Sequence, residues 1–337
     1  MKKIKILVTG GSGFIGSNFV LYMLKEHKNY QIINFDKLTY AGNPDNLKTA
    51  IGNPDYQFVR GDICCCRDIE KVMQNENIDY VVHFAAESHV DRSISGPEIF
   101  TNTNVLGTQI LLETVKKYQV KRFIHISTDE VYGSIEQGRF RETTPLAPNS
   151  PYSASKAASD FFVRAYYKTF GLPAIITRCS NNYGSYQFPE KLIPLMITNA
   201  LQDKPLPVYG NGENVRDWLY VLDHCSAIDK VLHYGKVGEV YNIGGNNEWT
   251  NIAVIKLILE QLNKPESLIE FVQDRAGHDQ RYAIDAAKIK DELGWQPLVD
   301  FSSGIKKTIN WYIENTEWIQ RIKTGQYQQG NDLSSYQ

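Results

Sequence analysis

Apolar runs and helical patterns alternate along the first 180 residues of the chain. The apolar runs lie at 4–9, 31–35, 56–59, 80–84, 123–126 and 174–177. Helical spacing of apolar residues covers 17–25, 107–117 and 154–169. Short buried strands that alternate with helices are typical of a parallel sheet with helices on both faces. The pattern therefore predicts an α/β fold with a doubly wound parallel sheet.

The pattern changes after about residue 183. Pro189, Pro194, Pro205 and Pro207 interrupt the chain, and short helices and strands alternate irregularly up to about residue 320. We expect residues 1–182 to form the sheet domain. Residues 183–323 are expected to form a smaller α/β lobe over it, with some segments returning to the first domain. Residues 324–337 are polar and predict a flexible tail.

A glycine-rich segment joins the first apolar run to the first helical pattern. Residues 10–16 read GGSGFIG and fit both G-x-G-x-x-G and G-x-x-G-x-x-G. Such a turn directs backbone N–H groups and a helix N-terminus at a pyrophosphate, as in a Rossmann domain. Asp36 follows the second apolar run, where a carboxylate binds a ribose and repels a 2′-phosphate. This predicts NAD, although Lys37 could serve a phosphate, and a glycine turn without a ligand is the alternative.

Composition narrows the class of protein. The 337 residues are 42% hydrophobic and 22% charged, and the net charge of −2 gives no electrostatic case for nucleic acid or a membrane surface. The apolar stretch after the N-terminal lysines is too short for a signal sequence, and no stretch is long enough to span a membrane. We expect a cytoplasmic protein. Cys64, Cys65 and Cys66 suit neither zinc nor an ordinary disulfide, and the histidines form no ligand pattern, so no metal site is predicted.

Two short segments carry the candidate chemistry. Tyr152 and Lys156 stand four residues apart, so they share one face of a helix. A lysine ammonium and a positively charged nicotinamide ring would favour the tyrosine phenolate, which could then take a proton from a sugar hydroxyl. Asp129 and Glu130 follow Thr128 and supply an acid and a base, as an elimination requires. Both can face a substrate only if the strand ends at Thr128 and the next turn curls over the pocket. The alternative is that one of the two merely caps the following helix.

Longer segments carry a resemblance over nearly the whole chain. They are FAAESHVDRS at 84–93, TDEVYG at 128–133, NNYG at 181–184, QFPEKLIP at 187–194, VRDW at 215–218 and RAGHD at 275–279. The chain resembles the extended short-chain dehydrogenase/reductase superfamily and, within it, the dTDP-glucose 4,6-dehydratases. The glycine loop and the Tyr/Lys pair identify only the superfamily, whereas the acid pair and the Asn-Asn segment are more specific.

The resemblance implies a reaction on dTDP-glucose. Tyr152, helped by Lys156 and Thr128, would deprotonate the 4-hydroxyl while hydride passes from C4 to NAD. Glu130 would then remove the C5 proton as general base, and Asp129 would protonate the departing 6-hydroxyl as general acid. Hydride would return to C6, so that tightly bound NAD is regenerated in each cycle.

The resemblance also implies which residues bind the ligands. For the cofactor these are Gly10, Gly13, Phe14, Ile15, Gly16, Asp36, Lys37, Leu38, Thr39, Asp62, Ile63, Phe84, Ala85, Ala86, Ser88, Thr103, Tyr152, Lys156 and Asn182. For the substrate they are Ser88, Thr128, Asn181, Lys191, Leu192, Pro207, Val208, Tyr209, Arg216, Asn251, Arg275 and His278. Alternatives exist for single residues: Ser88 could cap a helix, Arg216 could be solvated, and Tyr209 could stack on a base or fill an interface.

Two positions depart from the usual family pattern. Ser185 and Ala276 stand where proline is common, so two loops beside the nucleotide lack the restraint that proline imposes, and UDP is the alternative to dTDP. The resemblance further implies a homodimer that pairs the helices around 104–118 and 153–169. The apolar residues of the first helix, Val105, Leu106, Ile110, Leu111 and Val115, would equally well pack on their own sheet.

Three rival functions follow from the same fold. A sugar-nucleotide 4-epimerase would share NAD and the Tyr/Lys pair but would not need adjacent acids. A decarboxylase would need a cationic group for a C6 carboxylate, which these acids would repel. A non-catalytic protein that binds NAD would not need Tyr152 or Lys156.

Overall fold

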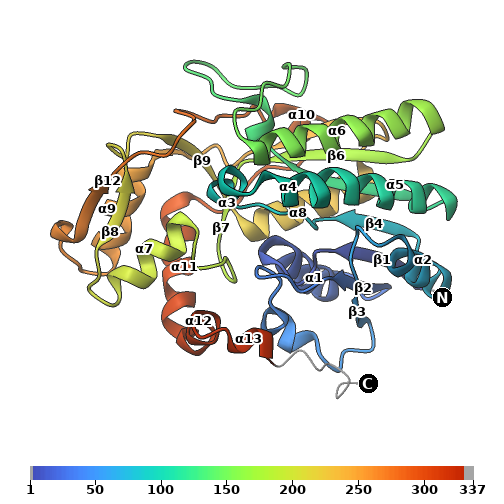
Figure 1. The fold of residues 1–337 in the computed structure, drawn as a ribbon, viewed down its shortest axis with the longest axis horizontal. Helices are drawn as coiled ribbons and strands as arrows, with labels where there is room; N and C mark the ends of the chain where they lie inside the picture. The colour runs from blue at the N-terminus through green and yellow to red at the C-terminus, as the bar shows by residue number, and fades with distance from the viewer. Residues whose placement is uncertain (1–2, 330–337) are drawn as a thin grey trace.

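A seven-stranded parallel sheet lies at the centre of the computed structural model, which describes residues 3–329 (Figure 1). Its strands are β1 (Ile4–Thr9), β2 (Tyr30–Asp36), β3 (Tyr56–Arg60), β4 (Tyr80–His83), β5 (Arg122–Thr128), β6 (Ala174–Cys179) and β10 (Val240–Ile243). The strand order is β10-β6-β5-β4-β1-β2-β3, and every pair is parallel. The order reverses between β1 and β4, which is where doubly wound sheets bind ligands. The predicted fold class is confirmed, and each predicted apolar run corresponds to a strand.

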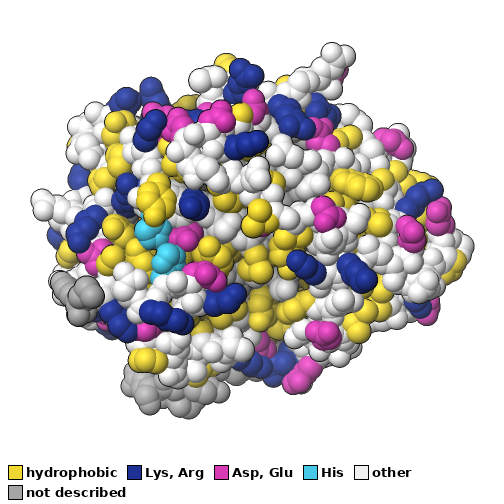
Figure 2. Space-filling model, turned by 180° about the vertical axis from the view of Figure 1, so that it is seen from behind, with side chains coloured by type: hydrophobic (Ala, Val, Ile, Leu, Met, Phe, Trp, Pro, Cys, Tyr) yellow, Lys and Arg dark blue, Asp and Glu magenta, His cyan; other side chains and the backbone are white. Residues whose placement is uncertain are grey.

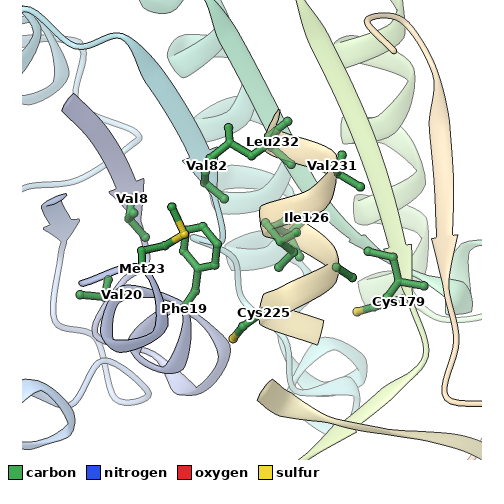
Figure 3. Close-up of a cluster of buried hydrophobic side chains, with 14 of the residues drawn as sticks. Val8, Phe19, Val20, Met23, Val82, Ile126, Cys179, Cys225, Val231 and Leu232 are labelled. Carbon is green, nitrogen blue, oxygen red and sulfur yellow. The ribbon is translucent and has the colours of Figure 1, made fainter. Parts of the chain in front are cut away.

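Helices cover both faces of this sheet. One face carries α1 (Phe14–Glu26), α8 (Val221–Tyr234) and α10 (Ala287–Leu293), and the other carries α2 (Cys66–Glu76), α5 (Thr108–Lys117) and α6 (Pro151–Phe170). Figure 3 shows side chains of α1, such as Phe19 and Met23, and of α8, such as Val231, gathered around Val8 and Val82 of the strands. Burying an aliphatic side chain of this size contributes about 1.5–3 kcal/mol, so these contacts anchor both helices to the sheet.

The start of α6 determines where its side chains lie. Ser150 and Ser153 form a capping box, and Pro151 occupies the first helical position. The helix therefore begins three residues before the predicted range and ends at Gly171, whose φ is 69°. As a result, Tyr152 lies in the first turn, and Lys156 lies one turn further on.

The second lobe has a separate hydrophobic core. Its strands are β7 (Asn181–Tyr183), β9 (Val215–Tyr220) and β11 (Glu248–Thr250) in one sheet, and β8 (Leu206–Tyr209) and β12 (Ile269–Val272) in another. Its helices are α7 (Leu192–Ala200), α9 (Asn251–Gln261), α11 (Phe301–Glu314) and α12 (Thr316–Lys323). Aromatic side chains such as Tyr183, Trp218 and Phe301 fill the space between them.

Short elements connect these parts. They are a 3-10 helix (Pro44–Ala50), α3 (Val90–Ser95), α4 (Pro97–Phe100), a π-helix (Thr101–Gly107), a 3-10 helix (Asp129–Tyr132) and a 3-10 helix (Glu266–Leu268). Among residues 3–329, no helix is long and apolar enough to cross a membrane.

The chain does not follow a simple division at residue 182. Strand β10 and helix α8 fall within 183–323, yet both pack on the central sheet. Part of the expected flexible tail is ordered, because residues 326–329 form α13 (Gln326–Gln329). Tyr327 of this helix is buried, and its hydroxyl donates to the Tyr40 carbonyl at 2.5 Å. One buried aromatic side chain thus holds this segment on the first domain in spite of its polar composition. Residues 330–337 of the expected tail lie outside the described part.

Candidate active site

A cavity opens at the carboxyl ends of β1, β2, β4, β5 and β6, between the sheet and the second lobe. The predicted residues that line it are Gly10, Gly13, Phe14, Ile15, Gly16, Asp36, Lys37, Thr39, Asp62, Ile63, Phe84, Ala85, Ala86, Ser88, Thr103, Thr128, Asp129, Glu130, Tyr152, Lys156, Asn181, Asn182 and Lys191. The structure therefore brings the glycine loop, the acid pair and the Tyr/Lys pair to one place.

The glycine loop packs so closely on neighbouring backbone that a side chain would not fit. Gly10 has a φ of +71°, and a Cβ there would lie 2.6 Å from the Ala85 nitrogen. A Cβ on Gly16 would lie 2.2 Å from the Gly10 carbonyl oxygen. Helix α1 begins at Phe14 without a side-chain cap, so its first N–H groups are available to an anion. This cradle fits a pyrophosphate.

Asp36 lies at the end of β2 with part of its carboxylate in use. Its Oδ2 accepts the Ser12 N–H at 2.9 Å, and its Oδ1 accepts the Leu38 N–H at 2.8 Å. A carboxylate has about four acceptor sites, so two remain for a ribose. Lys37 instead pairs with Asp62 at 2.8 Å, which balances its charge. The arrangement fits the adenosine ribose of NAD better than a 2′-phosphate.

The segment after β5 curls over the cavity, as both acids require. Strand β5 ends at Thr128, and a 3-10 helix follows directly. The Thr128 hydroxyl accepts the Glu130 N–H at 3.3 Å and donates to Asp129 Oδ1 at 3.3 Å. Thr128 is the N-cap, so the alternative that one of the acids caps this helix is wrong. Gly133 completes the turn with a φ of +86°, where a Cβ would lie 2.4 Å from the Ala147 carbonyl oxygen.

The two acids differ in their electrostatic surroundings. Burial raises the pKa of Asp129 well above its usual range, and the charges of Glu130 and Asp217 raise it further. Burial also raises the pKa of Glu130, but the cations Arg216 and Lys191 oppose that shift. Asp129 Oδ2 is buried and makes no hydrogen bond within the described residues. Asp129 is therefore suited to carry a proton, and Glu130 is the better candidate for the ionised form.

The Tyr/Lys pair is buried beside the acids. Lys156 donates to the Ile126 carbonyl at 2.8 Å, and burial lowers the pKa of Lys156 to about 8. Burial, followed by the charge of Glu130, raises the pKa of Tyr152 well above 10, whereas the Thr128 hydroxyl lowers it. The phenol therefore holds its proton until a further positive charge enters the site.

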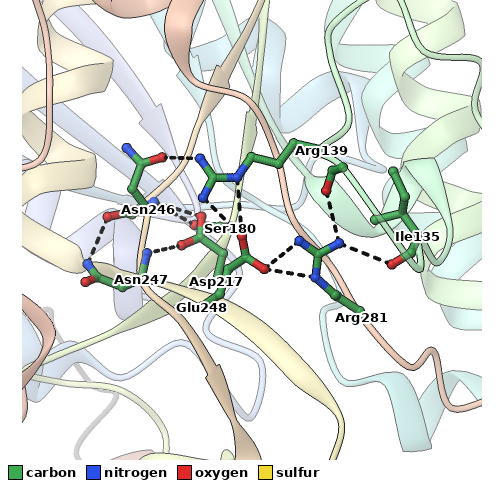
Figure 4. Close-up of polar contacts among 10 residues, drawn as sticks. Ile135, Arg139, Ser180, Asp217, Asn246, Asn247, Glu248 and Arg281 are labelled. Atoms are coloured by element: carbon green, nitrogen blue, oxygen red, sulfur yellow. Dashed lines mark hydrogen bonds and ion pairs between the residues drawn. The ribbon is translucent and has the colours of Figure 1, made fainter.

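A polar network supports this region from the second lobe (Figure 4). Arg139 and Arg281 both bind the Glu248 carboxylate of β11, at 3.1 and 2.6 Å. Asp217 of β9 accepts the N–H groups of Gly245 and Asn247 at 2.9 and 2.7 Å. These bonds fix the Asp217 carboxylate, whose charge contributes to the raised pKa of Asp129.

Ser88 and Lys191 lie together at the rim. The Lys191 ammonium donates to the Ser88 carbonyl at 2.9 Å. Helix α3 is capped by His89 rather than by Ser88, so the capping alternative for Ser88 is wrong. The Ser88 hydroxyl is exposed to the cavity.

The other residues predicted to bind ligands do not line the cavity; Leu38 belongs to the predicted cofactor set and the rest to the substrate set. Outside its lining are Leu38, Leu192, Pro207, Val208, Tyr209, Arg216, Asn251, Arg275 and His278. Arg216 is buried rather than solvated, and it donates to the Asp279 carbonyl at 2.9 Å. Arg275 pairs with Asp91 at 3.4 Å, and its buried Nε has no hydrogen-bond partner within residues 3–329.

The sequence prediction missed several residues that line the cavity. They include Glu87, Ile99, Ser180, Gln187, Phe188 and Glu190. Glu190 accepts the Tyr40 hydroxyl at 3.0 Å and pairs with Arg92 at 3.3 Å. The Arg92 guanidinium also lies 3.6 Å from the centre of the Tyr40 ring. Glu190 could have been found from the sequence, because it lies in the segment 187–194 that carries the family resemblance. In the structure it joins the second lobe to the cofactor side of the cavity.

Comparisons with known proteins agree with this geometry. Residues 7–308 match the family model described as GDP-mannose 4,6 dehydratase. A dTDP-glucose 4,6-dehydratase of Xanthomonas campestris is 54% identical over 340 residues, which cover 95% of this chain and 96% of the relative. Another from Salmonella typhimurium is 51% identical and covers 96% of this chain and 97% of the relative.

Solved structures give the same result. A dTDP-glucose 4,6-dehydratase of Bacillus anthracis, solved in complex with NAD, is 56% identical with a TM-score of 0.89, and the match covers 95% of this chain and 99% of that one. One from Streptomyces venezuelae, also with NAD, is 49% identical with a TM-score of 0.92, and it covers 95% and 100%. A UDP-glucose 4-epimerase of Thermotoga maritima is less similar, at 30% identity and a TM-score of 0.87, and it covers 93% and 100%.

Proposed function

The chain belongs to the family of dTDP-glucose 4,6-dehydratases, and on this premise we propose that it converts dTDP-glucose to dTDP-4-keto-6-deoxyglucose as an NAD-dependent hydro-lyase. The observation that carries the proposal is the acid pair at the end of β5. Asp129 and Glu130 lie in one cavity with Tyr152 and Lys156, and burial raises the pKa of both, but the cations Arg216 and Lys191 oppose the shift at Glu130. An epimerase has no use for such a pair.

The cofactor would lie in the cradle at the carboxyl ends of β1 and β2. Gly10 and Gly16 allow the closely packed loop that would present its backbone N–H groups to the pyrophosphate, and Asp36 has acceptor sites for the ribose. The chemistry that NAD supplies when bound is the removal of hydride from sugar C4 and its return at C6. The positive charge of its nicotinamide ring also favours ionisation of a neighbouring phenol.

Tyr152 acts as the base for the 4-hydroxyl. Its phenol is buried, so a positive charge beside it has a large effect on its pKa. Lys156 supplies one such charge from the next helical turn, and the Ile126 carbonyl holds that ammonium in place. The Thr128 hydroxyl lowers the phenol pKa further.

The acids carry out the elimination. Oxidation at C4 gives a ketone, which makes the C5 proton acidic. Glu130 takes that proton, the electron pair forms the C5–C6 double bond, and the C6–oxygen bond breaks. Asp129 gives its proton to the departing hydroxyl, which leaves as water. A proton returns from Glu130 to C5 when C6 is reduced. The proton that Tyr152 took from the 4-hydroxyl replaces the one that Asp129 gave to the departing water, so atoms and charges balance over the cycle.

The substrate diphosphate would bind at the second lobe. Arg275 has a buried, unpaired Nε, and a guanidinium fork matches phosphate geometry. We place Arg216 and His278 in the same nucleotide site. Asn181, Ser88 and Lys191 already line the cavity and would contact the sugar and its phosphates.

The assay of this proposal uses purified protein with dTDP-glucose and, in parallel, UDP-glucose. The readout is the alkaline absorbance of a 4-keto-6-deoxy sugar. We expect product from dTDP-glucose and much less from UDP-glucose. Absence of product from both sugars, with NAD shown to be bound, would contradict the proposal and favour an epimerase.

We also propose a cytoplasmic homodimer. Leu106, Phe161 and Phe162 are exposed on the helical layer formed by the π-helix and α6, and an apolar surface of this kind favours association. Leu111 and Val115 are fully buried against their own sheet and would not contribute. Sedimentation of the wild type and of Phe161→Asp measures the mass, and we expect only the wild type to be a dimer.

The division into domains completes the proposal. Residues 1–182 form the NAD-binding domain, together with the returning segments around α8, β10 and α10. The rest of 183–323 forms the sugar-nucleotide lobe. Limited proteolysis with and without NAD would test this, since NAD should protect the first domain more strongly than the second.

A further inference from the structure

Two histidines and an aspartate meet at the end of the molecule opposite the carboxyl ends of the strands. His27 follows the last residue of α1, and Asp229 and His233 lie one turn apart on α8. Their ligand atoms all lie within 4.8 Å of one another, and none of the three residues lines the active-site cavity. On the face shown in Figure 2, histidine side chains gather in one place beside acidic side chains. The cluster is therefore separate from the dehydratase chemistry.

The distances are close to those of a metal coordination shell. His27 Nε2 lies 3.0 Å from Asp229 Oδ1, and His233 Nδ1 lies 2.9 Å from the same oxygen. Zinc bonds of about 2.0–2.2 Å separate neighbouring tetrahedral ligands by roughly 3.3–3.5 Å. Shifts of a few tenths of an ångström would therefore bring both imidazoles to the right distance from Asp229, and the two imidazole nitrogens, which lie within 4.8 Å of one another, would have to reach the same spacing to admit an ion. The three side chains are 15–23% exposed, which leaves an open side for a water as fourth ligand.

A neighbouring tyrosine orients one of the ligands. The Tyr30 hydroxyl lies 2.5 Å from His233 Nε2. His233 Nδ1 lies 2.8 Å from the Asp229 carbonyl oxygen and 2.9 Å from its Oδ1, and both only accept, so Nδ1 donates in this arrangement. A metal ion at Nδ1 would replace that proton, and Nε2–H would then donate to the Tyr30 oxygen. Ligating histidines commonly have such an oxygen partner on the other ring nitrogen, because it fixes tautomer and ring orientation.

The end of helix α1 adds a favourable field. Helix α1 has 13 residues and ends at this cluster, and the C-terminal end of a helix carries a partial negative charge that favours a cation. At the end of α8, the Arg122 guanidinium already donates to the carbonyls of Val231, Leu232 and Gly235, so that end contributes little.

We propose that His27, Asp229 and His233 form a structural binding site for one divalent transition-metal ion of the zinc type. The ion would join the end of α1 to α8. The linear sequence does not reveal this site, because about 200 residues separate His27 from Asp229 and His233, and only the packing of α1 on α8 brings them together. Two imidazoles and one carboxylate are donors that suit zinc better than magnesium or calcium.

Zinc binding to the full-length protein, produced without a histidine tag and stripped by a chelator, tests the proposal. Zn²⁺ alone is titrated in competition with a chromophoric chelator. We expect one equivalent to bind, with at least tenfold weaker affinity in His27→Gln and in His233→Gln. Glu26→Gln removes a neighbouring charge from the same helix without removing a ligand, and it should bind as the wild type does. Equal affinity in all four proteins, or no binding in the wild type, would overturn the proposal.

Two further measurements distinguish zinc binding at this site from binding at the cysteines 64–66, and loss of a ligand from misfolding of the variant. Cobalt bound by nitrogen and oxygen lacks the sulfur charge-transfer bands that a cysteine site shows. We expect no such bands, and unchanged zinc affinity when all three cysteines are replaced by serine; loss of binding in that variant would overturn the assignment. Zinc should raise the Tm of the wild type but not that of His233→Gln, whose dehydratase activity shows that it is folded.

Discussion

The cofactor side and the substrate side of the cavity differ in how far their binding groups are already arranged. On the cofactor side, the glycines, Asp36 and Asp62 line the cavity and are held by the backbone or by neighbouring charges. On the substrate side, Arg275 pairs with Asp91, and His278 pairs with Asp274 at 2.7 Å, both outside the cavity lining.

The difference follows from what holds each group in place. Local geometry arranges the cofactor side: a strand end, a glycine turn and a helix start follow one another along the chain. We propose that the substrate side is assembled from loops of the second lobe, where Arg275 and His278 pair with the carboxylates of Asp91 and Asp274. A site of the first kind can retain a cofactor through many cycles, and one of the second kind can exchange its ligand. The acid pair and Tyr152 lie between the two sides.

The largest expected effect comes from Tyr152, where the two sides meet. Tyr152→Phe removes the base, and we expect turnover to fall by a factor on the order of 10³ while NAD stays bound. Activity and bound NAD are measured on the same sample. Tyr166→Phe on the same helix is the control, and its turnover should stay near that of the wild type. A Tyr152→Phe enzyme within tenfold of the wild type would contradict the assigned role.

A methyl group in the glycine cradle should damage the cofactor side alone. Gly16→Ala places a Cβ 2.2 Å from the Gly10 carbonyl oxygen, so the loop must shift. We expect NAD affinity to fall by about a hundredfold, which corresponds to about 2.7 kcal/mol. Gly96→Ala is the matched control, because its Cβ would have only an ordinary contact at 3.8 Å. Calorimetric titration of NAD into each stripped protein gives the comparison, and equal affinities would show that the cradle is not preformed.

Loss of a cation in the second lobe should affect only the substrate side. Arg275→Met removes a charged hydrogen bond to the diphosphate, worth about 1.5–3 kcal/mol, so KM should rise by roughly 10–150-fold. NAD retention should stay unchanged. Arg141→Met, which breaks a surface pair with Asp285, serves as control. If KM stays the same and kcat falls, the residue does not bind the diphosphate.

The smallest expected effect is on NAD dissociation, and it comes from Glu190, whose contacts join the substrate side of the cavity to the cofactor side. Glu190→Gln weakens the bonds from the second lobe to Tyr40 and Arg92. Exposed pairs of this kind contribute about 0.2–1 kcal/mol, so NAD should dissociate only a few times faster. The rate is followed by exchange against labelled NAD. Glu213→Gln, on a loop of the second lobe, should leave the rate unchanged; an equal acceleration there would mean that general charge loss is responsible.

The sequence predicted the central sheet and the cofactor side well, for a physical reason. The spacing of apolar residues and the residues of a turn are local properties of the chain. The strand before Gly10 and the place of Asp36 at the end of the second strand could therefore be predicted from the sequence. The helix start at Pro151 was placed three residues late, because a capping box rather than apolar spacing determines it.

Long-range packing explains what could not be predicted. The anchoring of Tyr327 on Tyr40 depends on contacts across 287 residues. The roles of Glu190 and of the Figure 4 network likewise depend on how the lobe lies on the sheet. The acid pair was found from its residues, but the different pKa shifts of Asp129 and Glu130 depend on Arg216, Lys191 and Asp217 from the second lobe.

The most direct test of the central claim separates oxidation from elimination in the two acid variants. Asp129→Asn and Glu130→Gln are each mixed with dTDP-glucose, and the absorbance of reduced cofactor and the exchange of the C5 proton with deuterated solvent are followed. The account predicts reduced cofactor in both variants, C5 exchange in Asp129→Asn, and no exchange in Glu130→Gln. Exchange that persists in Glu130→Gln and disappears in Asp129→Asn would contradict it, because the roles of acid and base would then be reversed.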